Sequence, residues 1–184
     1  MDKPSHASRE ACARGSLGPM ATFTMKHELA CDCERFWKLF FDADFNVALY
    51  KALEFPEWTL LDSKETDTEV VRSFRARPKM VAPAAVVKLL GSSFGYSEVS
   101  RFDKATKTIK FVIKTNTLTD KLRNEGTVKC EPRGAGKSLR VVEITAEAKV
   151  FGVGGMIESA FEKSFRSGWQ QSAEFTNRWV TDHP

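Results

Sequence analysis

The sequence predicts one domain of the α+β class, in which a curved antiparallel sheet of about seven strands packs against a long C-terminal helix. Through the middle of the chain, stretches in which apolar and polar residues alternate are separated by turn residues, which is typical of strands joined by hairpins. Toward the C-terminus the apolar residues instead recur with the period of an α-helix. The length of 184 residues fits a single domain, for which roughly 100–200 residues are usual.

The sheet is expected to begin with a strand that two short helices follow. Thr22–Leu29 alternates apolar side chains with Thr, Lys and Glu, as a half-buried strand does. Asp32 is a suitable N-cap for a helix that runs to Phe41, because its carboxylate can accept a hydrogen bond from the first turn. A second helix is expected at about 44–53, and Pro56 follows its end.

Six further strands are expected before the C-terminal segment. They lie at Glu57–Thr66, Thr68–Arg77, Phe94–Phe102, Thr108–Thr115, Leu122–Glu131 and Lys137–Val150. A different kind of element, Lys79–Leu90, separates the second of these strands from the third. This segment is short and apolar on most sides, contains Pro83 and ends at Gly91, so it does not continue the sheet.

The last predicted element is an amphipathic helix from Met156 to about Thr181. When its residues are placed at about 100° intervals, the apolar and small side chains share one face and the charged ones fall opposite. That face comprises Ile157, Phe161, Phe165, Gly168, Trp169, Ser172, Phe175 and Trp179. A helix of this length needs a wide, curved sheet to lie against.

The composition argues against several classes of protein. The 28 basic and 24 acidic residues give a net charge of only +4, so no nucleic-acid partner is expected. No run of about 18 apolar residues is present to span a bilayer. The four cysteines form no CxxC pair and the three histidines are scattered, so neither a metal site nor another cofactor is expected.

Reduced thiols and the lack of a secretion signal favour a cytoplasmic location, and the mixed surface charges favour a monomer.

Residues 1–20 differ from the rest of the chain. They are polar, rich in Pro, Gly and Ser, and contain no apolar stretch of the kind that a secretion signal needs. We expect them to be a disordered leader, either an upstream start or a remnant of an expression vector, with Met20 as the natural first residue. The folded domain is therefore expected at 21–181.

Two charged residues fall on the apolar face of the predicted sheet, Arg72 and Glu98. A lone buried charge costs several kcal/mol, so each needs a partner. Either the two pair with each other, or Arg72 awaits an anionic group of a ligand, or a β-bulge turns one of them outward. His27 is placed similarly on the first strand and is expected to be a hydrogen-bonded core histidine rather than a catalytic base.

The order of these elements resembles the helix-grip fold of the START-like (SRPBCC) superfamily over Ala21–Thr181, and within it an uncharacterised, largely bacterial branch. The stretches GYSEVSRFD at 95–103, KTNTL at 114–118 and NEG at 124–126 are also similar to PRELI-type phospholipid-transfer domains. The resemblance implies a cavity between the sheet and the long helix that takes up a hydrophobic ligand such as a lipid or sterol. It transfers no catalytic residue.

In this chain the segment 79–90 would cover such a cavity or touch a membrane surface transiently, with Lys79 and Lys88 near anionic headgroups. An ordinary short helix packed on the sheet edge is the alternative. The residues expected to contact the ligand are Trp58, Leu60, Arg72, Phe74, Met80, Val86, Leu90, Tyr96, Glu98, Phe111, Ile113, Ile144, Phe161, Phe165 and Trp169.

The expected function is therefore non-enzymatic binding, and transfer, of a lipid-like molecule. One alternative is a START-like enzyme of the cyclase or hydrolase type that uses His27, Glu98 and Tyr96. The other is a protein-interaction module whose cavity is filled by side chains. No nucleophile motif, paired carboxylates or phosphate-binding loop supports the enzyme.

Overall fold

The computed structural model of the chain describes residues 21–79 and 82–184, and it confirms the predicted α+β helix-grip architecture. A seven-stranded antiparallel sheet has the order β1-β7-β6-β5-β4-β3-β2. Its strands are β1 (Ala21–Leu29), β2 (Glu57–Glu65), β3 (Glu69–Arg77), β4 (Tyr96–Asp103), β5 (Thr108–Thr115), β6 (Leu122–Pro132) and β7 (Ser138–Ala148). The helices are α1 (Cys33–Phe41), α2 (Ala43–Ala52), α3 (Ala84–Leu90) and α4 (Gly154–Asp182).

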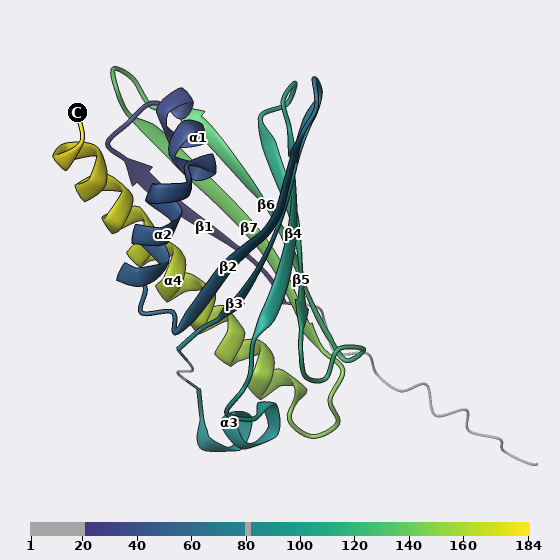
Figure 1. Cartoon of the computed structure of the whole chain (residues 1–184). Coiled ribbons are helices and arrows are strands. Elements are labelled where there is room, and N and C mark those ends of the chain that lie inside the picture. The colour runs from purple at the N-terminus through teal and green to yellow at the C-terminus, as the bar shows by residue number, and fades with distance from the viewer. Residues whose placement is uncertain (1–20, 80–81) are drawn as a thin grey trace, which may run out of the picture.

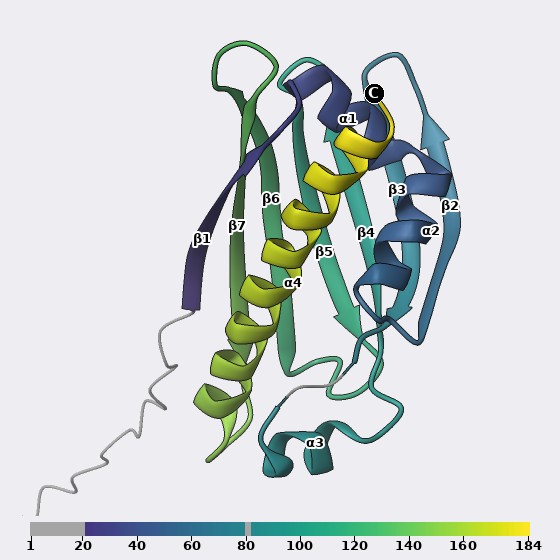
Figure 2. The same cartoon turned by 90° about the vertical axis from the view of Figure 1, so that its left-hand side faces the viewer.

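The sheet curves, and helices α1, α2 and α4 lie on the same face of it (Figures 1 and 2). Helix α4 runs along β1 and β7, the two strands with which it makes its main contacts. Helix α3 and the connection from β7 to α4 lie together at the opposite end of the molecule from the C-terminus (Figure 1). None of the helices in the described part of the chain is both long and apolar enough to cross a membrane.

Two aspartates connect and cap the first helices. The Asp32 carboxylate accepts a hydrogen bond from the Arg35 amide at 2.8 Å, as the sequence predicts for an N-cap. Asp42 ends α1 and also begins α2, where its carboxylate accepts from the Phe45 amide at 2.7 Å. Helix α2 therefore starts directly after α1, and this short connection restricts where α2 can lie over the sheet.

Helix α4 is longer at both ends than the predicted 156–181. Its first residue, Gly154, passes close to the end of β7: a Cβ atom there would lie 2.4 Å from the Ala148 carbonyl oxygen. Only a glycine can begin the helix this close to the strand.

The alternation of buried and exposed residues follows the prediction on β3 to β6 and fails on β2. On β7 the predicted face is buried, but Leu139 and Glu147 on the opposite face are buried as well. Leu60 was expected to face the core, and it is 40% exposed. Strand β2 forms the edge of the sheet, its register shifts between Leu60 and Asp62, and all its residues from 59 to 65 are exposed. The bulge and the edge position together leave this part of β2 without a covering element.

The buried apolar residues form two clusters. The larger one lies between the sheet and helices α1 and α4, and includes Phe36, Trp37, Phe111 and Ile144. The smaller one joins α3 to the end of β7 and the start of α4 through Val86, Leu90, Phe94, Leu122, Ala148, Ile157 and Ala160. Between the two clusters the interior is open.

Candidate functional site: a cavity between the sheet and helix α4

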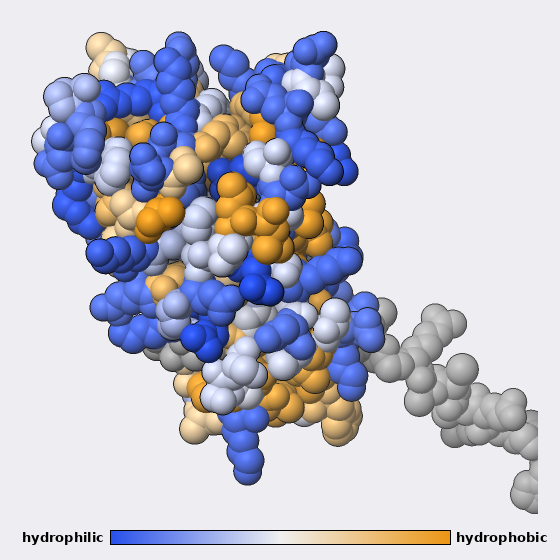
Figure 3. Space-filling model, viewed as in Figure 1, coloured by the Kyte–Doolittle hydropathy of each residue, from blue (hydrophilic) through white to orange (hydrophobic). Residues whose placement is uncertain are grey.

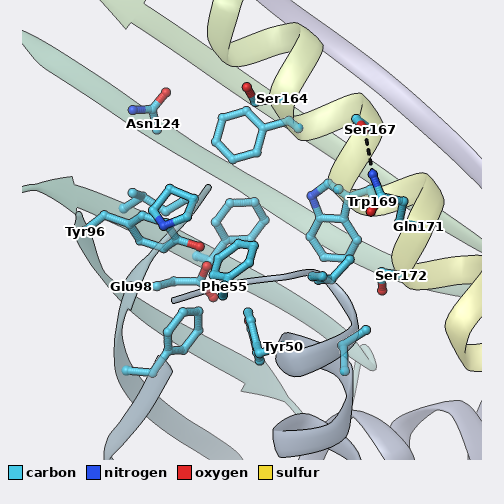
Figure 4. Close-up of a pocket in the computed structure, with 18 of the residues that line it drawn as sticks. Tyr50, Phe55, Tyr96, Glu98, Asn124, Ser164, Ser167, Trp169, Gln171 and Ser172 are labelled. Carbon is cyan, nitrogen blue, oxygen red and sulfur yellow. Dashed lines mark hydrogen bonds between the residues drawn. The ribbon is translucent and has the colours of Figure 1, made fainter. Parts of the chain in front are cut away.

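A cavity of about 440 Å³ lies between the sheet and α4, and α1, α2 and α3 contribute to its walls. Its volume falls within the range of roughly 300–1,000 Å³ that is usual for small-molecule sites. The exposed residues Lys163, Ser164, Ser167 and Gln171 on α4 also line it, so the cavity reaches the surface beside this helix. Figure 4 shows side chains from α2, β4 and α4 converging on this space.

Most of the residues predicted to contact a ligand line this cavity. They are Arg72, Phe74, Val86, Leu90, Tyr96, Glu98, Phe111, Ile113, Phe161, Phe165 and Trp169. Phe111 can lie across the neighbouring strand because residue 126 is a glycine. Any other residue there would place its Cβ atom 2.7 Å from the Phe111 ring. The wall is therefore largely apolar and aromatic.

Four of the predicted residues are not placed on the cavity. Trp58 stacks on Tyr50 with ring centroids 4.8 Å apart, outside the lining, and Leu60 is exposed on β2. Ile144 is completely buried in the large cluster, because β7 lies under α4 and the helix fills the space above it. Met80 lies outside the described residues.

The sequence did not single out several residues that line the cavity. Asn46 and Tyr50 come from α2, whose cavity-facing side could not be assigned without its position over the sheet. Arg140 lies on β7 and shares the parity of Val142 and Ile144, so strict alternation along the strand would have placed it on the buried face.

Arg72 is 5% exposed and points from β3 to the end of helix α1. Its Nη1 donates a hydrogen bond to the Phe40 carbonyl oxygen at 2.6 Å, and its guanidinium lies 5.4 Å from the centre of the Phe40 ring. The carbonyl belongs to the last turn of α1, which carries partial negative charge. The Nε of Arg72 is buried and has no hydrogen-bond partner in the described part of the chain.

Glu98 faces the same cavity from the adjacent strand. Arg72 is paired with Ser100 and Phe74 with Glu98, and the register between β3 and β4 runs without a shift. No bulge turns either charge outward, and within residues 21–79 and 82–184 the two side chains form no ion pair. Burial raises the pKa of the Glu98 carboxyl to about 7, although the positive charge of Arg72 opposes the shift.

Two tyrosines surround this carboxyl. Tyr96 lies two residues before Glu98 on β4, and Tyr50 reaches the cavity from α2 (Figure 4). Burial is the main cause that raises the pKa of both phenols, so both hydroxyls stay protonated near neutral pH. Farther along the wall, Asn124 is 2% exposed and its Oδ1 has no hydrogen-bond partner among the described residues. The cavity thus contains several hydrogen-bonding groups in an apolar wall.

Arg140 is a second buried cation on the cavity wall. Its Nη2 donates to the Trp169 carbonyl oxygen at 2.6 Å and its Nη1 to the Ser172 hydroxyl at 3.1 Å, and its guanidinium lies 4.8 Å from the centre of a Trp169 ring. Desolvation lowers the pKa of Arg140 to about 9. Arg140 therefore ties β7 to helix α4.

His27 is buried beside Arg140 and does not line the cavity. Its Nδ1 has no hydrogen-bond partner in the described residues, which differs from the hydrogen-bonded histidine that the sequence predicts. Burial, together with the nearby Arg140, lowers its pKa to about 4, so it is neutral near pH 7. Across the described ranges, no cluster of His, Cys, Asp or Glu could hold a metal ion.

Several solved structures have the same fold as this chain. A START superfamily protein from Mycobacterium smegmatis is 13% identical, with a TM-score of 0.57 over 86% of this chain and 98% of that one. The ZhuI aromatase/cyclase from Streptomyces sp. R1128 is 11% identical, with a TM-score of 0.62 over 88% and 96% of the two chains. Norcoclaurine synthase from Thalictrum flavum is 13% identical, with a TM-score of 0.59 over the whole of both chains.

The implied START-like fold is therefore confirmed, while identities this low establish the fold alone. A search of curated proteins finds no match to the sequence. One family profile does match, over residues 24–180, and its description is "protein of unknown function (DUF2505)". Because the match covers most of the chain, the protein belongs to the DUF2505 family.

Proposed function

We propose that the protein binds a hydrophobic small molecule or lipid in the cavity between the sheet and α4 and carries it without changing it chemically. The observation that supports this most directly is a largely apolar cavity of about 440 Å³ that reaches the surface beside α4. A module whose core is filled by side chains would have no such space. The free cysteines Cys31, Cys33 and Cys130 suit a reducing compartment, and we propose a cytoplasmic location on this ground.

Transfer of the ligand would require contact with a membrane. At the end of the molecule formed by α3 and the β7–α4 connection, Leu89 is 41%, Met156 44% and Phe151 fully exposed. Figure 3 shows apolar surface gathered at this lower end, close to where α3 contributes to the cavity wall. Lys88 lies exposed beside Leu89 and suits an anionic headgroup. We propose that this end touches the membrane transiently.

A second candidate function is supported by Glu98. A carboxyl with a pKa near 7 in an apolar cavity, next to the Tyr96 hydroxyl, can act as a general acid or base. Two of the structural neighbours are named as a cyclase and a synthase. His27 has no part in this candidate because it does not line the cavity.

Mass spectrometry and a neutral dye test the proposed function. Native mass spectrometry of protein purified from cells, followed by organic extraction, is expected to show one bound hydrophobic molecule of unchanged structure. Nile red, a neutral apolar dye, is expected to bind the emptied protein with a stoichiometry of about one. Absence of both a co-purified molecule and dye binding would contradict a ligand cavity. Conversion of the extracted molecule by wild-type protein but not by Glu98→Gln would favour the enzyme.

A further inference from the structure

We propose that the ligand is an apolar molecule with a single carboxylate, which binds at Arg72 and shares one proton with Glu98. This inference rests on the proposed function, because it names the class of ligand that the same cavity takes. It follows from the charges on the wall, from the unused donors of Arg72 and from the position of Glu98.

The charged side chains of the cavity wall are predominantly cationic. In its interior, Arg72 and Arg140 face a single acidic residue, Glu98. At the rim, Lys163 has no acid within ion-pair distance among the described residues, while Lys79 and Glu54 form an ion pair with each other. Buried charges require compensation, so a ligand with one negative charge complements this wall better than a neutral or cationic one.

The two arginines differ in what their donors already bind. The Nε atoms of both arginines are buried without a partner in the described part of the chain, but Arg140 uses both terminal nitrogens in hydrogen bonds to α4 and stacks on Trp169, so its position is fixed by the fold. Arg72 makes one hydrogen bond, to the Phe40 carbonyl, although a guanidinium has five N–H donors. Its Nη2 makes no hydrogen bond within the described residues, and we therefore assign the carboxylate of the ligand to Arg72.

A carboxylate at Arg72 would lie next to Glu98. The two residues are diagonal neighbours on paired strands, and such positions lie roughly 7–8 Å apart. The other groups around Glu98 are Tyr50 from α2 and Tyr96 from β4, both neutral, while the paired position on β5 is the apolar Ile113. A carboxylate bound at Arg72 adds a negative charge beside Glu98 and neutralises the cation that favours its ionised form, so binding of the anion favours one proton shared by the two carboxyl groups.

This proton gives the inference a measurable consequence. Glu98 is partly ionised at neutral pH in the empty protein, and a bound carboxylate favours its protonated form. The complex therefore takes up as much as one proton at pH 8, and the affinity for the ligand falls as the pH rises from 7 to 8, below the pKa of about 9 that desolvation gives Arg140. The hydroxyls of Tyr50 and Tyr96 stay protonated over this range and do not alter the sign.

The test compares dodecanoate, dodecanol and dodecylamine as ligands by titration calorimetry in buffers of different ionisation enthalpy. Dodecanoate is expected to bind about tenfold or more tightly than the other two, because its head group forms charge-assisted hydrogen bonds. Arg72→Met, which keeps an unbranched side chain between Phe40 and Phe41, is expected to bring dodecanoate to the level of dodecanol. Glu98→Gln is expected to abolish the proton uptake and the pH dependence while dodecanoate still binds.

The outcomes separate this inference from the proposed function. Equal affinities for the three compounds, or dodecanoate binding without proton uptake at pH 8, would overturn the carboxylate assignment while the cavity function stands. Binding of Nile red but of none of the three dodecyl compounds would overturn it as well. If neither the dye nor any dodecyl compound binds, the proposed function itself fails. Where Arg72→Met does not fold, the Glu98→Gln variant alone tests the inference. Loss of proton uptake in that variant identifies Glu98 as the group that takes up the proton.

Discussion

Arg72 and Glu98 face the same cavity from neighbouring strands without forming an ion pair. Arg72 instead donates to the Phe40 carbonyl at the end of α1, and Glu98 points into the open space. A buried cation and a half-buried acid that remain unpaired are costly for stability, and such arrangements are common where a protein binds a ligand. The relationship between these two side chains is thus the main reason to regard the cavity as a binding site for an apolar ligand with a polar head group.

Filling the cavity should separate ligand binding from folding. Gly168 lies on the cavity side of α4, and a Cβ atom there would meet nothing within 4 Å. Gly168→Leu is expected to raise the free energy of unfolding by up to about 1 kcal/mol, because glycine is unfavourable within a helix, and to weaken Nile red binding at least tenfold. Urea unfolding and dye titration measure the two effects.

Gly155→Leu is the matched control for this variant. Residue 155 is also a helical glycine with open space around its Cβ, but it does not line the cavity. This control should leave dye binding unchanged. Equal loss of binding in both variants would mean that the dye binds elsewhere.

Glu98 by itself should contribute stability to the empty protein at acidic pH, and this contribution is lost toward neutral pH. Its pKa rises from 4.5 in the unfolded chain to about 7 in the fold, so the folded state binds the extra proton as the pH falls from 7 to 4.5. The contribution is present below pH 4.5, is lost as the pH rises through 7, and amounts to about 1–3 kcal/mol. Glu98→Gln is expected to remove this dependence and to be more stable than the wild type at pH 8.

His27 should have the opposite effect over nearly the same range. Its pKa falls from 6.5 in the unfolded chain to about 4 in the fold, so the unfolded state binds the proton first as the pH is lowered. The wild type is therefore expected to change little in stability between pH 4.5 and 6.5, because the two residues offset each other. His27→Leu should become more stable as the pH falls through this range, and Glu98→Gln less stable. Parallel profiles for both variants in urea unfolding would refute the assignment.

Phe151 should matter for membranes and not for folding. Its side chain is fully exposed in the β7–α4 connection, so Phe151→Ser is expected to leave the free energy of unfolding within about 0.5 kcal/mol of the wild type. Binding to vesicles that contain phosphatidylserine, measured by flotation, should fall several-fold. The matched control is Val112→Ser, which removes a side chain that is 45% exposed on β5. If Val112→Ser weakens vesicle binding as much, the membrane contact is not at this end.

Local pattern was sufficient for most of the fold. Alternation along β3 to β7 placed their buried faces, Asp32 marked the start of α1, and the helical period of 157–179 identified α4. These features depend on residues close together in the sequence, and the order of turns leaves a hairpin-connected sheet as the simple solution. Strand β2 departed from the pattern because its exposure depends on its edge position and its bulge, which alternation does not reveal.

The sequence by itself thus determined the class of the fold, the long amphipathic helix and a set of apolar side chains with two unexplained charges, Arg72 and Glu98. Only the tertiary structure decided that these charges remain unpaired, that Arg140 is a second cation on the wall and that Tyr50 completes the site from α2. The reason is physical. Secondary structure follows from short-range periodicity, whereas a cavity and its electrostatics depend on where helices of fixed length settle over the sheet and on which space they leave open.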